Sequence, residues 1–477
     1  MHAMTLLSYL NTLADREPGR RLLGSENGWL TAAEAQRAVA RLGRVFVSLG
    51  LKPGDLAALC TERCVETALA IFALRAAGVL TVLCSPKQTI EETLSSCEAE
   101  ITPRARIERT AEGFSVQIDG QRHLVLPNDD AEATLPEISP FDPAFVIFTS
   151  GSTGKSKAVV QCEQNHISNL LDSKPLGAYC DDDIALGALP LEHVFGLVLL
   201  CGIAVLGYSI YFPEKTDVLS LLRCIEKEHI TRMNGVPSLY LALAERSKDY
   251  DLSSLRAGFV GGGPVTPSQF ADIEQALGMT LISVYGMSEC IGISCASWRD
   301  PQIARACGVG PVYPMNEVRI IRPDGGEAGP GQEGEITVRG PMRMLGYFGE
   351  KSLPPEDFFP TGDLGFLDDQ GVLHLSGRKK EIIIRNGNNL SPRRIEGALL
   401  SLPGVSAAAV VGLPDDREGE VPCAMIVGEV DDAALHVLLH KNEWPAGILY
   451  VDTLPLTGSG KPDKQKIREV LLRWRSS

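Results

Sequence analysis

Residues 148–157 read Phe-Thr-Ser-Gly-Ser-Thr-Gly-Lys-Ser-Lys and follow the apolar run Ala144–Phe148. The backbone N–H groups and hydroxyls of such a loop can surround a phosphate, while its lysines neutralise the charge. A Walker loop would need glycine where Thr149 stands and would open a helix, but Ala158–Val160 is short and β-branched, as in a strand. The stretch therefore predicts a strand–loop–strand grip on a triphosphate, in preference to a P-loop or a flexible Ser/Gly loop.

Composition indicates a globular protein with more than one domain. At about 100–200 residues per domain, 477 residues predict at least two. The 45 Lys and Arg face 60 Asp and Glu, for a net charge of −15. Such a surface should repel nucleic acid and anionic membranes, so we expect no nucleic-acid partner. A polyanionic substrate must then be held by a local basic cluster, which Lys155 and Lys157 offer.

The cysteines and the N-terminus favour a reducing compartment. The twelve cysteines show no CxxC pair and no zinc-type spacing. Cys60 and Cys64 are four residues apart, which suits one helix face, and we expect them to be buried thiols. Met1–Arg20 mixes Asp, Glu and Arg among short apolar groups, unlike a signal peptide. We therefore expect a cytoplasmic protein.

One apolar segment is close to the length of a membrane span. Phe195–Phe212 holds eighteen residues without a charge. It contains three glycines and ends in the β-rich run Tyr208–Phe212. We interpret it as a buried helix followed by a buried strand and expect no membrane span.

Most of the chain alternates short apolar runs with amphipathic stretches, which predicts an α/β body. The expected helices are Ala32–Leu49, Thr67–Ala77, Val218–Glu228 and Pro267–Leu277. The expected strands are Asp55–Cys60, Thr81–Cys84, Ala257–Val260, Leu281–Val284, Val318–Ile321 and Glu335–Arg339.

After Asp368-Asp369-Gln370-Gly371, a hairpin signal, the pattern predicts a compact α+β unit. Its expected helices are Pro392–Leu400 and Asp463–Trp474, and its expected strands are Ala407–Val411 and Ala424–Val427.

Further motifs follow residues 148–157 in a fixed order: Gly261-Gly262-Gly263-Pro264, Val284-Tyr285-Gly286-Met287-Ser288-Glu289, Thr361-Gly362-Asp363, Gly377-Arg378-Lys379-Lys380-Glu381 and Leu456-Thr457-Gly458-Ser459-Gly460-Lys461. Over nearly all 477 residues the chain closely resembles the acyl-adenylate-forming superfamily, which comprises acyl-CoA synthetases, peptide-synthetase adenylation domains and luciferases. In motif style it is closest to acyl-CoA synthetases. The resemblance implies a large multi-sheet α/β body over residues 1–377, with layered subdomains and a distorted β-barrel-like part. It also implies a small mobile α+β domain over residues 378–477, with its hinge near Lys380.

The resemblance implies that a carboxylate attacks the α-phosphate of ATP, that pyrophosphate leaves, and that a thiol then takes the acyl group. Catalysis would rest on positioning and charge neutralisation. The implied nucleotide-binding residues are Thr149, Ser150, Ser152, Thr153, Lys155 and Lys157 for the β- and γ-phosphates, Gly261, Gly262, Gly263 and Tyr285 for adenine, Ser288 for the α-phosphate, and Asp363 and Arg378 for the ribose. Gly151, Gly154, Gly286 and Met287 are expected to bind the nucleotide as parts of the same motifs.

Three further roles are implied by position. Glu289 is the expected Mg²⁺ ligand, because a hard carboxylate suits a hard cation. Lys461 matches the catalytic lysine that bridges ATP and the carboxylate. Gly387 matches a glycine on the path of the thiol. Ser156 stands where the family often has proline and Ser288 where it commonly has threonine, and both changes leave the donors of the site intact.

The acid pocket is implied by Leu191–Gly196, which resembles the segment where acyl-CoA synthetases carry a histidine at the mouth of the acyl site. The implied pocket residues are His193 (also catalytic), Val194, Phe195, Gly263 and Tyr285. Amino-acid-activating relatives place an aspartate where this chain has Val194. Burying an unpaired α-ammonium costs several kcal/mol, so an α-amino acid is disfavoured as substrate.

The sequence thus predicts an Mg-ATP-dependent acid–thiol ligase acting on a carboxylic acid without an α-amino group, with coenzyme A as the favoured acceptor. One alternative is a stand-alone adenylating enzyme that loads a separate carrier protein or forms an amide with an amine. Another is a binding protein that kept the fold and lost catalysis. The acid itself stays open among aliphatic, aromatic and polyketide-like acids.

Overall fold

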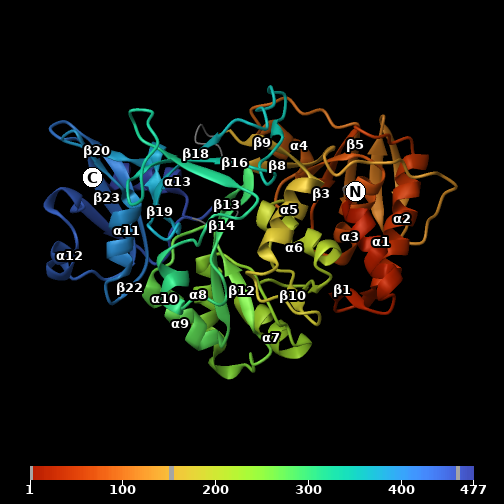
Figure 1. The fold of residues 1–477 in the computed structure, drawn as a ribbon, viewed down its shortest axis with the longest axis horizontal. Coiled ribbons are helices and arrows are strands. Elements are labelled where there is room, and N and C mark those ends of the chain that lie inside the picture. The colour runs from red at the N-terminus through yellow and green to blue at the C-terminus, as the bar shows by residue number, and fades with distance from the viewer. Residues whose placement is uncertain (1–3, 150–154, 458–461, 477) are drawn as a thin grey trace.

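The computed structural model describes residues 4–149, 155–457 and 462–476. The N-terminal elements lie at one end of the molecule and the C-terminal elements at the other, with the middle of the chain between them (Figure 1). The described residues form five sheets with helices packed against them. The predicted mixed α/β class is confirmed.

The largest sheet carries the two strands that flank residues 150–156. Its strand order is β17-β9-β8-β4-β3-β5-β6-β7. The strands are β3 (Leu56–Cys60), β4 (Leu80–Cys84), β5 (Ala105–Arg109), β6 (Phe114–Ile118), β7 (Gln121–Val125), β8 (Pro143–Thr149), β9 (Lys157–Cys162) and β17 (Gly346–Tyr347). The central pairs β5–β3, β3–β4 and β4–β8 are parallel, and the outer pairs are antiparallel.

Helices cover both faces of this sheet, as a parallel centre requires. Ala57 and Leu59 of β3 face a core shared with α1 (Leu6–Arg16), α2 (Ala32–Ser48) and α3 (Val65–Ala76). Ala58 points the other way, toward α4 (Ile90–Ser95). The alternation follows from the two-residue period of a strand.

Two further sheets form a second layer and are connected to each other through one buried arginine. Arg232 forms isolated bridges to Ala185 of β10 and Ala257 of β12, which connects the sheet β10-β11-β1-β2 with the sheet β12-β13-β14. Its guanidinium pairs with buried Asp183 at 2.8 Å and lies 3.7 Å from the ring centre of Tyr179. A buried charge persists only with such partners, so Arg232 has a structural role.

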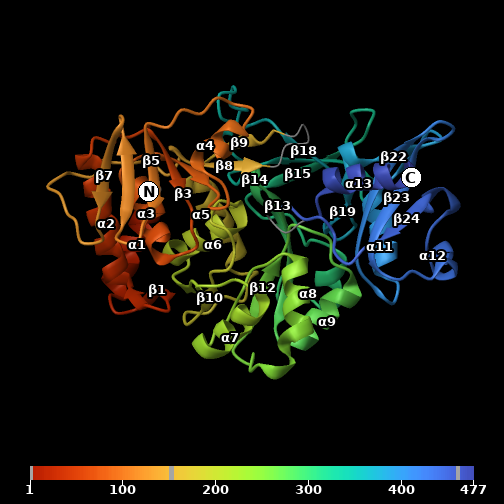
Figure 2. The ribbon, with the colours of Figure 1, turned by 180° about the vertical axis from the view of Figure 1, so that it is seen from behind.

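The elements of this layer are β1 (Arg21–Ser25), β2 (Gly28–Thr31), β10 (Ile184–Leu186), β11 (Ser209–Tyr211), β12 (Ala257–Val260), β13 (Thr280–Met287), β14 (Cys290–Cys295), α5 (Glu163–Ser173), α6 (Val194–Val205), α7 (Val218–Glu228), α8 (Pro237–Arg246), the 3₁₀ turn η1 (Ser247–Asp249), α9 (Pro267–Leu277) and α10 (Gln302–Cys307). Figure 1 and Figure 2 both show α7, α8 and α9 beside β12 at one margin of the molecule.

The apolar segment Phe195–Phe212 forms most of α6 and then β11, as predicted. Most of α6 is buried in the core that it shares with α1. Among the described residues, no helix is long and apolar enough to cross a membrane.

A four-stranded antiparallel sheet has the strand order β15-β16-β18-β19. Its strands are β15 (Glu317–Ile321), β16 (Gly334–Arg339), β18 (Phe359–Leu367) and β19 (Leu373–Arg378). The predicted hairpin is present, since the Gly371 N–H donates to the Asp368 carbonyl between β18 and β19. The pairing of β18 is interrupted by register shifts on both sides.

The C-terminal residues build their own sheet and cores. The elements are the 3₁₀ turns η2 (Lys379–Glu381) and η3 (Lys441–Glu443), the strands β20 (Ile383–Arg385), β21 (Asn388–Leu390), β22 (Val405–Asp415), β23 (Gly419–Gly428) and β24 (Gly447–Tyr450), and the helices α11 (Pro392–Leu400), α12 (Asp432–Leu438) and α13 (Lys464–Ser476). Val410 of β22 faces α11, whereas Val411 faces α13. The α+β class of this unit is confirmed, while the boundary at residues 377 and 378 stays a prediction.

One local expectation is wrong. Cys60 ends β3 and Cys64 is the N-cap of α3, so their thiols do not share a helix face. Both residues are half-buried, and burial raises the pKa of the Cys60 thiol to about 11. The thiol of Cys60 is therefore neutral and unreactive at physiological pH.

Candidate active site

The predicted phosphate loop connects two antiparallel strands. Thr149 of β8 lies opposite Lys157 of β9, so a strand follows the loop and the P-loop alternative is excluded. Ser150, Gly151, Ser152, Thr153 and Gly154 lie outside the described residues. Lys155 is exposed, and the Ser156 N–H donates to the Ser96 carbonyl at 2.9 Å. A proline at position 156 could not make this bond, which anchors the end of the loop near α4.

Glu289 lies in a tight turn at the end of β13. Met287 pairs with Cys290 of β14, so Ser288 and Glu289 form the turn between the strands. The Glu289 side chain is buried and accepts a hydrogen bond from the Tyr347 hydroxyl at 3.0 Å. Burial raises the pKa of this carboxyl, and the rise is opposed by hydrogen bonds and by the charges of Arg378 and Lys157.

Tyr347 was not anticipated from the sequence. Its ring lies under the Lys157 ammonium, with Nζ 4.4 Å from the ring centre, and its hydroxyl contacts Glu289. One side chain thus touches the predicted phosphate lysine and the predicted metal ligand. The signal that could have indicated it is an aromatic residue, a type that favours strands, directly after Gly346.

Two buried polar residues hold the same turn from behind. The Gln161 amide donates to the Ser288 carbonyl at 2.6 Å, and its oxygen lies 2.9 Å from His166 Nε2. Burial lowers the pKa of His166 to about 3, so the ring is neutral and Nε2 is the atom that donates. The amide nitrogen of Gln161 must face Ser288, because the opposite orientation would place two oxygens in contact. A glutamine directly after the apolar run Ala158–Val160 is the signal that sequence reasoning missed.

A second cluster joins Tyr285, Asp363 and Arg378. The Tyr285 hydroxyl donates to Asp363 Oδ2 at 2.7 Å, and Arg378 Nε lies 3.2 Å from Asp363 Oδ1. Asp363 and Arg378 are direct partners in the β18–β19 pair, which explains their spacing of fifteen residues. Burial raises the pKa of Tyr285 well above its usual value, so the phenol stays a donor.

Arg393 brings the C-terminal unit to this cluster. It lies in the first turn of α11, and its charge interacts with Asp363, Tyr285 and Arg378. Burial lowers the pKa of Arg393. Sequence reasoning missed this residue, because no predicted motif includes it.

The glycine run follows β12 and leaves backbone exposed. A Cβ on Gly261 would lie 2.9 Å from Val284 Cγ2, so the chain passes too close for a side chain. Gly262 has a φ of +81°, which favours glycine. Gly262 and Gly263 are both exposed, so their backbone is free to approach a ligand.

The predicted acid-pocket residues lie at the start of α6. His193 is the N-cap residue, and Val194 and Phe195 are partly buried. Phe195 packs against the hydrophobic cluster to which Tyr285 belongs. Glu192 accepts a hydrogen bond from the Thr61 hydroxyl at 3.2 Å.

Lys461 lies outside the described residues, but the described residues on either side of it are joined by backbone contacts. Leu456 and Pro462 form an antiparallel bridge, and the Asp463 N–H donates to the Pro455 carbonyl at 2.8 Å. Lys464 then pairs with Glu396 of α11.

Lys380 lies in the exposed turn η2, directly after Arg378. Gly387 and Asn386 both have positive φ and form the two-residue turn between β20 and β21. Among the described residues, no atom lies within 4 Å of a Cβ placed on Gly387, so none of them encloses this glycine. The hinge and the thiol path therefore stay predictions.

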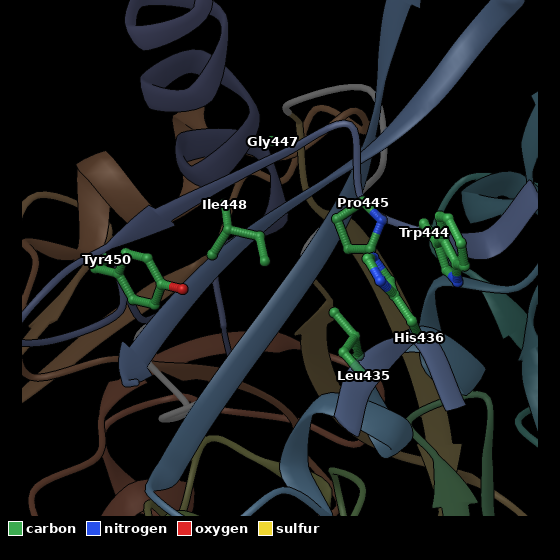
Figure 3. Close-up of a pocket in the computed structure, with 7 residues that line it drawn as sticks. All are labelled: Leu435, His436, Trp444, Pro445, Gly447, Ile448 and Tyr450. Carbon is green, nitrogen blue, oxygen red and sulfur yellow. The ribbon is translucent and has the colours of Figure 1, made fainter. Parts of the chain in front are cut away.

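A cavity of about 340 Å³ lies in the C-terminal unit (Figure 3). It is lined by Leu435, His436, Trp444, Pro445, Gly447, Ile448 and Tyr450. The His436 ring stacks on Trp444 with 3.8 Å between ring centres. None of these residues belongs to the predicted site, so the cavity is separate from the clusters at Glu289 and Asp363.

Family models match most of the chain. The model for AMP-binding enzymes matches residues 10–348, and the model for the AMP-binding enzyme C-terminal domain matches residues 394–461. The chain belongs to the AMP-binding enzyme family. Among curated AMP-binding relatives, a feruloyl-CoA synthase from an Amycolatopsis species is 32% identical and covers 92% of this chain and 93% of its own length.

Two further relatives are each 28% identical. A 2-succinylbenzoate–CoA ligase from Bacillus cereus covers 98% of this chain and 99% of its own length. A salicyl-AMP ligase and salicyl-S-ArCP synthetase from Mycobacterium tuberculosis covers 97% of this chain and 90% of its own length. The structure of o-succinylbenzoate coenzyme A synthetase from Bacillus subtilis with ATP and a magnesium ion has a TM-score of 0.80 at 27% identity. It covers 97% of this chain and 99% of its own chain. The predicted superfamily, fold class and enzyme class, an AMP-forming acid–thiol ligase, are confirmed.

The described residues suit a magnesium–nucleotide complex. They contain no cluster of three or more His, Cys, Asp or Glu that would hold a metal by protein ligands alone. Mg²⁺ typically binds one or two carboxylates together with substrate phosphates, and Glu289 offers one such carboxylate. Lys155 and Lys157 supply the cations that a triphosphate requires.

Proposed function

We propose that this chain uses Mg-ATP to convert a carboxylic acid into an acyl-adenylate and then transfers the acyl group to coenzyme A. One observation carries the proposal. Cation–carboxylate clusters stand at both ends of Tyr285–Glu289. Because these five residues include a turn, the clusters are roughly 10 Å apart, less than a fully extended segment would span. The Arg378 charge acts on Asp363 in one cluster and on Glu289 in the other. That spacing suits one nucleotide, with its ribose at the first cluster and its phosphates at the second.

Each cluster has a part in the proposed first step. Glu289 would hold the Mg²⁺, which together with Lys155 and Lys157 would neutralise the charge of the triphosphate. Asp363 accepts hydrogen bonds from the ribose hydroxyls, which compete with Tyr285 for the same oxygen. Two anions must meet in this step, so fixed positive charge lowers the barrier.

The remaining predicted roles complete the proposal. Ser288 donates to the α-phosphate, the backbone of Gly261–Gly263 flanks adenine, and Lys461 bridges the phosphate and the acid. We propose that residues 378–477 then turn about Lys380 and bring Gly387 to the path of the thiol. We also retain the prediction of a cytoplasmic enzyme.

The acid is proposed to lack an α-amino group and to carry an aromatic ring. Val194 offers no carboxylate to a substrate ammonium, which disfavours amino acids. Three AMP-binding relatives are named for feruloyl, 2-succinylbenzoate and salicyl substrates, all of which contain a ring. Aryl acids therefore come first in a substrate panel.

Pyrophosphate release over a panel of aryl, aliphatic and amino acids tests this proposal. Each acid is assayed with and without coenzyme A, and the CoA thioester is identified by mass. Glu289→Ala serves as the inactive control and should lose at least about 10² in rate, because the triphosphate charge is then uncompensated. Failure of every acid to release pyrophosphate would refute adenylation.

The second candidate function is loading of a separate carrier protein. It is favoured by one relative, the salicyl-S-ArCP synthetase. In the same assay it predicts adenylate formation without a CoA thioester, and acylation of an added holo carrier protein. A CoA thioester formed at the rate of pyrophosphate release would exclude it as the main activity.

A further inference from the structure

Tyr347 occupies a special place beside the proposed phosphate and metal groups. It lies opposite Val159 in the β17–β9 pair. Directly opposed residues share a face of the sheet, and so do residues two apart on one strand. Lys157 is two residues before Val159, so its side chain is the diagonal neighbour of Tyr347. This register places the ammonium over the ring at 4.4 Å.

The hydroxyl of the same residue is directed at the metal ligand. It donates to Glu289 Oε1 at 3.0 Å. Burial raises the pKa of this phenol, so it keeps its proton and remains a donor at every physiological pH. A carboxylate that accepts this bond has one oxygen fixed and its other oxygen left for a cation.

Lys157 and Glu289 are close enough to influence one another, yet they do not pair. Burial raises the pKa of Glu289 and the Lys157 charge opposes that rise, but no ion pair within 4.0 Å joins these two described residues. Tyr347 stands between them, with its ring toward the cation and its hydroxyl toward the anion. A direct pair would neutralise both charges and remove them from a ligand.

We propose that Tyr347 is a positioning residue that keeps Lys157 and Glu289 apart and aligned, so that the lysine stays available to phosphate and the carboxylate to Mg²⁺. The inference rests on the proposed function, since it assigns a task toward the same magnesium nucleotide. Neither residue is altered chemically by Tyr347. Its contribution is to hold opposite charges in separate, preorganised places.

Two substitutions separate the two contacts. Tyr347→Phe keeps the ring under Lys157 and removes only the hydrogen bond to Glu289. Tyr347→Leu also removes the ring, so Lys157 is free to pair with Glu289. Tyr208→Phe is the matched control, because it removes a buried tyrosine hydroxyl that donates to the Leu199 carbonyl at 2.6 Å in the core around α6.

Calorimetric titration with ATP, in excess Mg²⁺ and in EDTA, provides a readout that does not depend on turnover. In Tyr347→Phe the factor by which Mg²⁺ tightens ATP binding should fall about tenfold, as for loss of one hydrogen bond to a charged group. ATP binding in EDTA should stay within twofold of wild type. In Tyr347→Leu the affinity in EDTA should fall as well, because Lys157 is then drawn to Glu289.

The controls distinguish a positioning role of Tyr347 from a general loosening of the folded structure. Tyr208→Phe should lower the melting temperature without changing the Mg²⁺ factor. If Tyr347→Phe left that factor unchanged, or weakened ATP equally with and without Mg²⁺, the inference would be overturned. The phenylalanine variant decides this even if Tyr347→Leu does not fold. If wild type bound no ATP under either condition, the proposed function itself would fail, and that result is distinct from the first two.

Discussion

Replacing His166 with glutamine should make the protein less sensitive to acid. His166 is fully buried on α5, and burial lowers its pKa to about 3. A histidine in the unfolded chain titrates near 6.5. Between these two pKa values the unfolded state binds a proton at this histidine and the folded state does not. Stability is therefore lost as the pH falls from about 6.5 toward 3.

The two pKa values set the size of the effect. From pH 7 to pH 5 the His166 contribution to the free energy of unfolding should fall by about 2 kcal/mol. Glutamine places an N–H donor close to the position of Nε2, so the bond to Gln161 can be kept while the titration is removed. A difference of this size is measurable against a total stability of about 5–15 kcal/mol.

Urea unfolding at pH 7 and pH 5, followed by tryptophan fluorescence, measures the effect in wild type and in His166→Gln. The other titrating groups are shared by the two proteins, so they cancel in the comparison. His123→Gln, on the outer strand β7 and only partly buried, is the control for the replacement of any histidine by glutamine. If His166→Gln lost stability between the two pH values to the same extent as wild type, the reasoning from burial would be refuted.

Two further predictions concern the acid and the second half-reaction. Val194→Asp should lower kcat/KM for the native acid at least about tenfold, because it buries an unpaired carboxylate beside the substrate's own; a gain in activity on that acid would show that the substrate carries a cation. Lys461→Ala should slow adenylate formation by about 10²–10³ and still convert a supplied acyl-adenylate into thioester, as for loss of one charge-stabilising donor. Lys380→Pro, which restricts φ at the proposed pivot, should have the opposite pair of effects. Separate assays of the two half-reactions decide this, and parallel losses in both variants would argue against domain rotation.

Several elements could be predicted to the residue because their ends are encoded locally. α9 begins with a capping box between Thr266 and Gln269, carries Pro267 at its first position, and ends at Gly278 in the left-handed conformation. α7 starts after the N-cap Asp217, whose side chain accepts from the backbone. Such signals act over three or four residues and need no partner elsewhere.

Some expected element boundaries differ from those in the structure, because a distant contact or an ambiguous local pattern determined them. The expected helix Thr67–Ala77 starts two residues earlier, at Val65, because Cys64, four residues after the end of β3, takes the N-cap position. The four-residue spacing of Cys60 and Cys64 is equally compatible with a helix and with a strand-to-helix turn. Periodicity alone could not distinguish them.

The sequence by itself determined the motifs and therefore the family, together with those site residues that stand within a motif. Asp363 and Arg378 meet because a hairpin returns the chain upon itself, and Ser288 and Glu289 share a turn for the same local reason. These pairings depend on short loops, whose closure costs little entropy.

Only the tertiary structure decided what supports that site. Tyr347 reaches Glu289 across 58 residues, and Gln161 reaches the Ser288 carbonyl across 127. Arg393 meets the Asp363 cluster only because α11 packs beside β19. No local propensity encodes such contacts. They arise when the sheets are layered and buried polar groups must find partners far along the chain.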